Sequence, residues 1–240
     1  MEKLARIACG GLLCTCAFLT ACGPSEEKKA QFAEKKRIDC LDKFCEGDAL
    51  PKYDSQKEVP LKFAGQWFIG PKEYFSSGIN GASFEWWDHK PISKGVPRPP
   101  GAQALVVAGN WYDISVEIFL RSHDGVIHGA PRYERLRKAE AEGRLISKAV
   151  PRPGLEVWHI RETDGVGSGL WYVATQYTAT NPNGAVLWCE KSDRKLDRCV
   201  TAFTWRPGVA ADMRFRAEHS ADWPEIYEET IRILKQLRKA

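Results

Sequence analysis

The sequence predicts an α+β protein built mainly from an antiparallel β-sheet, with an amphipathic C-terminal helix packed on it. In the second half of the chain, short segments of alternating hydrophobicity are separated by turns rich in Gly, Pro, Asn and Asp. Segments this closely spaced leave no room for crossover helices, so neighbouring strands are expected to run antiparallel. The chain closes with residues 222–237, whose apolar positions recur with the period of a helix.

The N-terminal residues have the pattern of a secretory signal. Two basic residues, Lys3 and Arg6, precede an apolar run from residue 7 to 19, which is too short to span a bilayer as a permanent helix. The run closes with Leu-Thr-Ala-Cys at residues 19–22, which resembles the lipobox of bacterial lipoproteins. The resemblance implies cleavage before Cys22 and membrane attachment through acyl chains on that residue. The alternative is an ordinary signal peptide, or a membrane helix with an incidental cysteine.

This interpretation of the N-terminus divides the chain into three predicted regions. Residues 1–21 are the expected signal peptide, and residues 22–37 are too polar to bury apolar area, which predicts a flexible tether. Residues 38–240 are the expected globular α+β domain. Gly23, rather than an aspartate, follows Cys22. By the sorting rules of the lipoproteins that the lipobox resembles, this implies the inner leaflet of the outer membrane, facing the periplasm.

Four cysteines remain in the globular part. An even number in an exported protein indicates two disulfides, and local pairing would join Cys40 to Cys45 and Cys189 to Cys199. The second pair flanks a segment that is predicted as strand, polar turn and strand. A pairing between the N-terminal segment and the C-terminal half stays open. A zinc site at Cys189 and Cys199 is disfavoured because their spacing matches no zinc pattern.

The first half of the globular part contains three predicted strands. They cover residues 57–69, with a break at Gly65, residues 82–87 and residues 113–121. Prolines and glycines between residues 91 and 101 predict a loop that separates the second strand from the third.

The second half begins with a predicted helix over residues 131–144 and continues as a run of strands. The closing helix has Asp222 as its capping residue and Pro224 in its first turn, and it is expected to cross one face of the sheet. The five predicted strands are residues 155–161, 169–178, 185–190, 199–205 and 211–217.

A short repeat leaves a second domain organisation open. The tetrapeptide Val-Pro-Arg-Pro occurs at residues 96–99 and again at residues 150–153, each time before strand-like sequence. Two related lobes, at about residues 38–148 and 149–240, are therefore an alternative to one domain.

The helix predicted over residues 131–144 is strongly basic on its polar side. Arg132, Arg135, Arg137 and Lys138 follow one another within two turns. The sequence allows two interpretations, a solvated surface helix or a docking face for an acidic partner.

The search for catalytic motifs predicts no enzyme. Residues 165–169 are Gly-Val-Gly-Ser-Gly, which matches neither a nucleophile elbow nor a dinucleotide-binding loop. His123, Asp124 and His128 are the only histidine cluster, and a hydrolase that uses them is the rival hypothesis. Their spacing is not that of a helical metal-binding pair, and Asp124-Gly125 indicates a turn. We therefore expect no catalytic residue, no metal and no cofactor.

Trp86 and Trp87 are candidate partner contacts. Adjacent residues of a strand point to opposite faces of the sheet. One of the two tryptophans is therefore expected in the core, and the other is expected to contact a sugar or a peptide.

The layout as a whole resembles a known family. A lipobox, a charged tether, an antiparallel half and a closing helix that begins Ala-Asp-Trp-Pro-Glu-Ile-Tyr at residues 221–227 resemble the lipoproteins that give immunity to type VI secretion phospholipase effectors. The resemblance implies a non-enzymatic, periplasm-facing protein that binds a toxin protein. An envelope-assembly or cell-wall-binding lipoprotein is the alternative. The formal net charge of +4 is too small to favour nucleic acid as a partner.

Overall fold

The computed structural model describes residues 25–87, 89–92, 105–107, 110–112, 115–125, 127, 129–161, 169–175, 186–190 and 198–240 of the 240-residue chain. The predicted signal peptide and its neighbour Cys22 lie outside these residues. The chain separates into two units, residues 1–36 and residues 37–240. Along the described segments, no helix combines the length and the apolarity that a membrane crossing requires.

Helix α1 (Glu26–Asp39) occupies most of the segment that the sequence predicted as a flexible tether. None of its residues is buried. Charged side chains interact along its surface, and Lys29 Nζ lies 2.7 Å from Glu26 Oε1 one turn away. Because the helix has no apolar face to bury, this segment stays in contact with solvent. The sequence predicted a solvated, flexible tether here and did not predict this helix.

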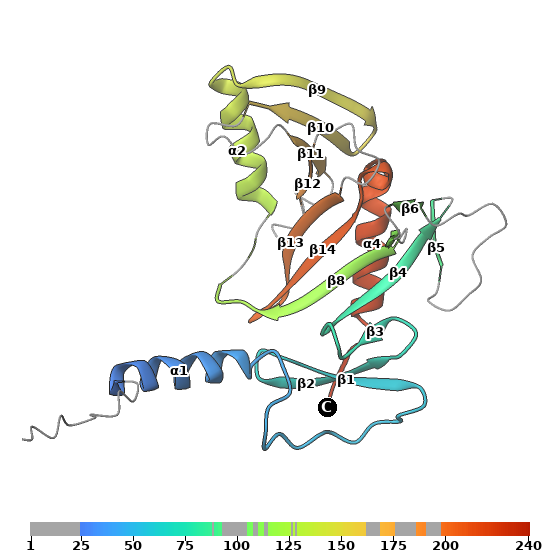
Figure 1. The fold of residues 1–240 in the computed structure, drawn as a ribbon. Helices are drawn as coiled ribbons and strands as arrows, with labels where there is room; N and C mark the ends of the chain where they lie inside the picture. Colours follow the sequence, from blue (N-terminus) through green and yellow to red (C-terminus); the bar gives the residue numbers. More distant parts are fainter. Residues whose placement is uncertain are drawn as a thin grey trace, which may run out of the picture. The chain divides into compact units, whose positions relative to one another are not determined.

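The described strands pair antiparallel, and ten of them form one large sheet (Figure 1). Their order is β3-β4-β8-β14-β13-β12-β11-β10-β9, with β5 beside β4. The strands from β10 to β14 are neighbours in chain order, which confirms the predicted antiparallel meander, and β9, which the sequence did not predict, extends it beside β10. The strands of this main sheet are β3 (Phe75–Ser76), β4 (Gly81–Trp87), β5 (Lys90–Ile92), β8 (Ser115–Ser122), β9 (Leu145–Arg152), β10 (Leu155–Ile160), β11 (Gly169–Ala174), β12 (Val186–Glu190), β13 (Arg198–Arg206) and β14 (Val209–Arg216).

The sheet continues across the boundary that two lobes would need. Strand β8, from the first half of the chain, lies between β4 and β14 and pairs with both. Residues 148 and 149 both fall inside β9, which pairs with β10.

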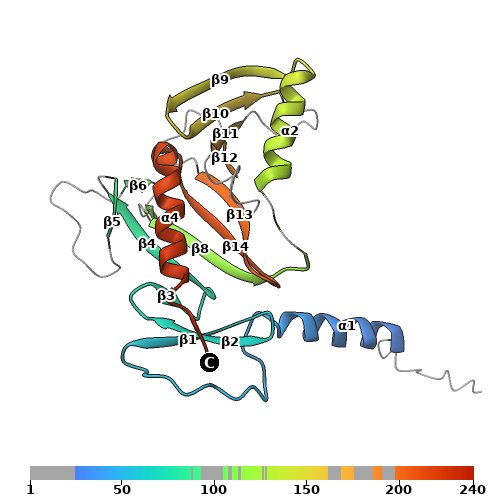
Figure 2. The ribbon, with the colours of Figure 1, turned by 180° about the vertical axis from the view of Figure 1, so that it is seen from behind.

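Helix α4 (Trp223–Leu234) follows the 3-10 helix η1 (Ala217–Asp222) and crosses one face of the main sheet, in front of the strands in Figure 2. Its Tyr227 ring lies 5.1 Å from the ring of Phe203 on β13. The predicted amphipathic C-terminal helix packed on the sheet is therefore confirmed. The buried residues of α4 recur at helical spacing and are Trp223, Pro224, Ile226, Tyr227, Thr230, Ile233 and Leu234.

Helix α2 (Gly129–Ala141) lies at the β9–β12 end of the main sheet (Figure 1). Its Leu136 and Ala139 are buried in a cluster with Trp158 and Ile160 of β10. This cluster is separate from the larger core that α4 covers. Helix α4 lies on the opposite face of the sheet from α2 (Figures 1 and 2). Among the described helices, none covers the α2 face farther along, toward β13, β14 and β8.

Two smaller sheets complete the described strands. Strands β1 (Glu58–Phe63) and β2 (Gln66–Pro71) form a hairpin, and β15 (Arg238–Lys239) adds to β2. The sequence did not predict β15, because two residues are too few to show an alternation. Strands β6 (Leu105–Val107) and β7 (Asn110–Tyr112) pair with each other.

The short loop closed by the Cys40–Cys45 disulfide carries the carboxylate that joins the hairpin to the main sheet. Asp42 Oδ1 accepts hydrogen bonds from the Ser122 hydroxyl at 2.6 Å and from the Ala64 backbone N–H at 3.2 Å. The Ser122 backbone N–H also donates to this carboxylate, at 2.9 Å. One side chain therefore ties the end of β1 to the end of β8.

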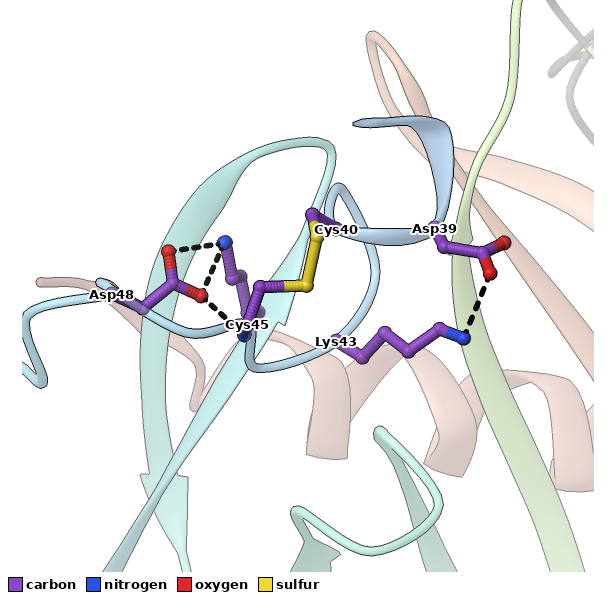
Figure 3. Close-up of a disulfide and its surroundings, with 6 residues drawn as sticks. Asp39, Cys40, Lys43, Cys45 and Asp48 are labelled. Atoms are coloured by element: carbon purple, nitrogen blue, oxygen red, sulfur yellow. Dashed lines mark hydrogen bonds and ion pairs between the residues drawn. A yellow bond between two sulfur atoms is a disulfide. The ribbon is translucent and has the colours of Figure 1, made fainter. Parts of the chain in front are cut away.

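The same loop has further ionic contacts (Figure 3). Lys43 Nζ lies 3.1 Å from Asp39 Oδ2. Asp48 accepts hydrogen bonds from Lys62, a buried lysine of β1, and from the Cys45 backbone N–H at 2.8 Å. The hydrogen bond from Lys62 is the main reason that the pKa of Asp48 lies below its usual range.

We expect Asp42→Ala to lower the free energy of unfolding by about 2–4 kcal/mol, because it leaves the part-buried N–H and hydroxyl of Ser122 without this acceptor. Asp39→Ala, at the end of α1 next to this loop, is the matched control, since Asp39 makes an exposed ion pair that is worth about 0–1 kcal/mol. Urea denaturation of both variants measures the difference. Equal midpoints for the two variants would show that Asp42 does not hold the hairpin.

Candidate functional site

One row of paired residues crosses six strands on the α2 face of the main sheet. Trp158 of β10 lies opposite Trp171 of β11, which lies opposite Trp188 of β12. The row continues through Val200 of β13 to Arg214 of β14, and Glu117 of β8 comes next. Cross-strand neighbours on one face are close enough for their side chains to touch. The row therefore changes from aromatic to charged along the sheet.

The aromatic part of the row emerges from beneath α2. Trp158 is fully buried, Trp171 and Trp188 are half-buried, and Val200 is 43% exposed. Helix α2 is held over the buried end by Glu156, whose Oε2 accepts hydrogen bonds from the Tyr133 hydroxyl at 3.0 Å and from Trp158 Nε1 at 2.8 Å. Burial, and then the bond to Glu156, raise the pKa of the Tyr133 hydroxyl.

A groove of about 590 Å³ lies where the sheet leaves the cover of α2. We call it the α2 groove. Its volume is in the range of sites that hold a small ligand or a few side chains of a protein partner. Its lining residues are Phe119 of β8, Arg132, Arg135 and Leu136 of α2, Trp171 of β11, Trp188 of β12, Val200, Thr201 and Ala202 of β13, and Asp212, Met213 and Arg214 of β14.

Ion pairs border the α2 groove on the strand side. Arg121 donates two hydrogen bonds to Asp212, and these raise the pKa of the arginine. Arg214 pairs with Glu117 and also lies over the Phe119 ring, at 4.5 Å from its centroid. The carboxylates of this part of the sheet are thus already engaged by strand arginines.

Arg132 differs from these arginines. It is half-buried on α2, and burial lowers the pKa of its guanidinium while the nearby charge of Asp212 acts in the opposite direction. Among the residues that the structure describes, no hydrogen bond or ion pair within 4 Å joins it to another side chain. A guanidinium that has lost part of its water without gaining a partner is energetically costly.

The two tryptophans predicted as partner contacts lie in different environments. Trp86 is 2% exposed, and its indole N–H donates to Asp222 Oδ2 at 2.9 Å. Trp86 is thus the tryptophan of the pair that belongs to the core, as expected for one of the two. Trp87 is half-buried and its side chain points to the opposite face of β4, so a partner contact there stays a prediction.

Asp222 does not have the helix-capping role that the sequence predicted. It precedes α4, but its side chain makes no capping hydrogen bond to that helix. Its carboxylate binds Trp86 instead, and its Oδ1 lies 2.7 Å from His89 Nδ1. A long-range partner therefore replaces the local bond that the sequence pattern favoured.

The predicted cysteine pairs are both present as local bridges. Cys40 is joined to Cys45, and Cys189 of β12 is joined to Cys199, directly opposite it on β13. The second bridge lies next to the α2 groove, because Trp188 and Val200 are the chain neighbours of its two cysteines.

The rival histidine cluster is described only in part. His123 is half-buried and Asp124 is exposed, whereas His128 lies outside the described residues, as do most of residues 165–169. Within the described part of the chain, no three His, Cys, Asp or Glu side chains gather as metal ligands would.

The sequence did not predict the α2 groove as a site. Its basic helix was noted as a possible docking face, but Phe119, Trp171, Trp188 and Val200 looked like ordinary strand residues. A signal was present in the alternation of each strand, because these residues lie out of phase with the positions that fill the larger core. That signal shows a face of a strand and does not show which strands are neighbours.

No known protein family matches the sequence, and no curated protein is similar to it. Among solved structures, the chain is similar to Smlt3025, an immunity protein of the Stenotrophomonas maltophilia type IV secretion system. The two are 16% identical, with a TM-score of 0.47, and the match covers 76% of this chain and 94% of that chain. A likeness of this degree carries no argument about function, which has to come from the site itself.

Proposed function

We propose that this chain is a non-enzymatic, lipid-anchored binding protein that neutralises a toxin protein by docking it at the α2 groove. The observation that carries the proposal is the composition of the groove, where Trp171, Trp188 and Phe119 lie beside arginines. Trp and Arg are the residues that most often dominate the binding energy of protein interfaces, with charged residues at the rim.

The exposure of Val200 in the groove also supports a docking surface for a protein partner. Val200 lies in a strand with neighbours on both sides, yet it is 43% exposed between Trp188 and Arg214. An exposed apolar residue beside half-buried tryptophans, bordered by ion pairs, has the arrangement of an interface with an apolar centre and a polar rim.

The most specific form of the proposal is an immunity protein against a type VI secretion phospholipase effector, which follows from the resemblance of the sequence layout. Docking would occlude the active site of the toxin, so the lipoprotein itself needs no catalytic residue. The solved structure similar to this chain is named as an immunity protein of a type IV system. Effectors of both secretion systems therefore belong in the test.

The first experiment introduces charge into the groove. We expect Val200→Glu to weaken toxin binding about thirtyfold or more, as loss of an interface hot spot does, and to abolish protection of cells that express the toxin in the periplasm. Val150→Glu is the matched control, because Val150 is 62% exposed on β9 and does not line the groove. Binding is measured by calorimetry and protection by survival.

Two outcomes would contradict the proposal. A toxin that kills equally with and without this protein would disprove the immunity role. Full protection by the Val200→Glu variant would show that the toxin does not dock at the α2 groove. Partners are found by pull-down with the purified chain from lysates that contain secreted effectors. Recovery of envelope components alone would favour the assembly or cell-wall-binding alternative.

The proposed anchor is tested separately. Cys22→Ala is expected to move the protein from the outer-membrane fraction to the soluble or inner-membrane fraction, because firm attachment needs two or more acyl chains. Cys16→Ala is the matched control, since Cys16 lies within the segment that is removed with the signal. Density-gradient fractionation gives the result, and an unchanged distribution of the Cys22→Ala variant would disprove the lipid anchor.

A further inference from the structure

Charge in the α2 groove is unbalanced. Three guanidinium groups and one carboxylate line it, from Arg132, Arg135, Arg214 and Asp212. The carboxylate of Asp212 accepts two hydrogen bonds from Arg121 on the neighbouring strand β8. Glu117, next to the groove, is engaged by Arg214 and lies 3.6 Å from Arg198 Nη1. Asp212 and Glu117 are thus each engaged by a strand arginine, and the charged residues that line the groove carry an excess of positive charge.

Arg132 is where this excess is least compensated. It lines the groove from α2, it is half-buried, and within the described residues its only electrostatic partner is the more distant charge of Asp212. An arginine fork presents several N–H donors in one plane, which match the two oxygens of a carboxylate. The indoles of Trp171 and Trp188 line the same groove and add apolar surface to it.

We propose that the α2 groove receives an acidic side chain of the partner protein, with its carboxylate on Arg132 and an adjacent apolar side chain against Trp171 and Trp188. This inference rests on the proposed function and specifies the chemistry of its partner. The occupant is a protein segment that carries Asp or Glu next to an apolar residue. The acid is favoured because its charge complements that of Arg132, and the adjacent apolar residue is favoured because it can pack on Trp171 and Trp188.

The test uses a random dodecapeptide library displayed on phage, selected on the purified full chain. Enriched sequences are expected to carry Asp or Glu beside an apolar residue. In synthetic copies, replacing that acid by its amide is expected to weaken binding about tenfold to a hundredfold, and Arg132→Met is expected to do the same. The two changes together are expected to cost little more than either alone, because they remove the same contact.

Two controls accompany these measurements. Arg137→Met removes an equal charge from the exposed side of the same helix and is expected to leave peptide affinity unchanged. Thermal unfolding separates binding from structure, because Arg132→Met removes a partly desolvated charge and is expected not to lower the melting temperature. A lowered melting temperature would assign Arg132 a structural role and contradict the inference.

The outcomes separate this inference from the proposed function. Peptides that lose affinity with Val200→Glu but bind the Arg132→Met variant and the wild-type protein equally would overturn the acidic occupant and leave the groove as the docking site. Peptides whose affinity is also unchanged by Val200→Glu would show that the α2 groove is not the docking site. A selection that enriches no groove-binding peptide, or only peptides without a carboxylate, would also contradict the inference.

Discussion

Replacing Gly81 with alanine is expected to lower the free energy of unfolding by about 3 kcal/mol or more, at the upper end of the usual cost of overpacking. A Cβ atom at Gly81 would lie 2.0 Å from the backbone carbonyl oxygen of Ile118 on β8. Gly81 pairs with Phe119 where β4 meets β8, so neither backbone can yield without opening the sheet. Strand β4 would have to move, and with it the buried side chains of Phe84 and Trp86.

The measurement is thermal unfolding of the alanine variant, with an expected fall of the melting temperature by about 6–12 °C. Gly78→Ala is the matched control, because its added Cβ would meet only the Ser76 hydroxyl at 3.7 Å, an ordinary contact distance. The control is expected to unfold within about 2 °C of the wild-type protein. A Gly81→Ala variant as stable as this control would show that β4 and β8 do not pair as closely as described.

Removing the Cys189–Cys199 bridge is expected to lower the free energy of unfolding by about 2–4 kcal/mol and to weaken partner binding as well. Without the bridge, the unfolded chain regains the conformations that a ten-residue separation had restricted. Both cysteines are also buried in the larger core, so their loss affects packing in addition. Because Trp188 and Val200 are their chain neighbours, a looser β12–β13 pair would misplace two residues of the α2 groove.

The corresponding experiment compares two double variants by thermal unfolding and by binding. Cys189→Ala with Cys199→Ala is expected to lose stability and partner affinity together. Cys40→Ala with Cys45→Ala is expected to lose stability only, because that bridge closes a surface loop whose residues do not line the α2 groove. Equal partner affinity in both double variants would show that the groove does not depend on its adjacent disulfide.

Local patterns were enough to predict much of the fold. Strands β10 to β14, the Pro207-Gly208 turn and the apolar stripe of α4 each depend on residues close together in the chain, so they could be predicted from periodicity and turn chemistry. The favoured cysteine pairs were also local, and the structure contains both. Where a local signal competed with a distant partner it failed, as when Asp222 bonded to Trp86 and not to the first turn of α4.

What the sequence by itself determined is the class of strands β10 to β14 and of helices α2 and α4, and which face of each is apolar. Only the tertiary structure decided that Trp171, Trp188, Val200 and Arg214 form one row, because the row depends on strand order and register across the sheet. The same holds for Arg132, which lies about 80 residues from Asp212 in the chain and shares a groove with it. Periodicity shows which side chains leave a strand on the same side, whereas a binding site requires knowledge of which strands are neighbours.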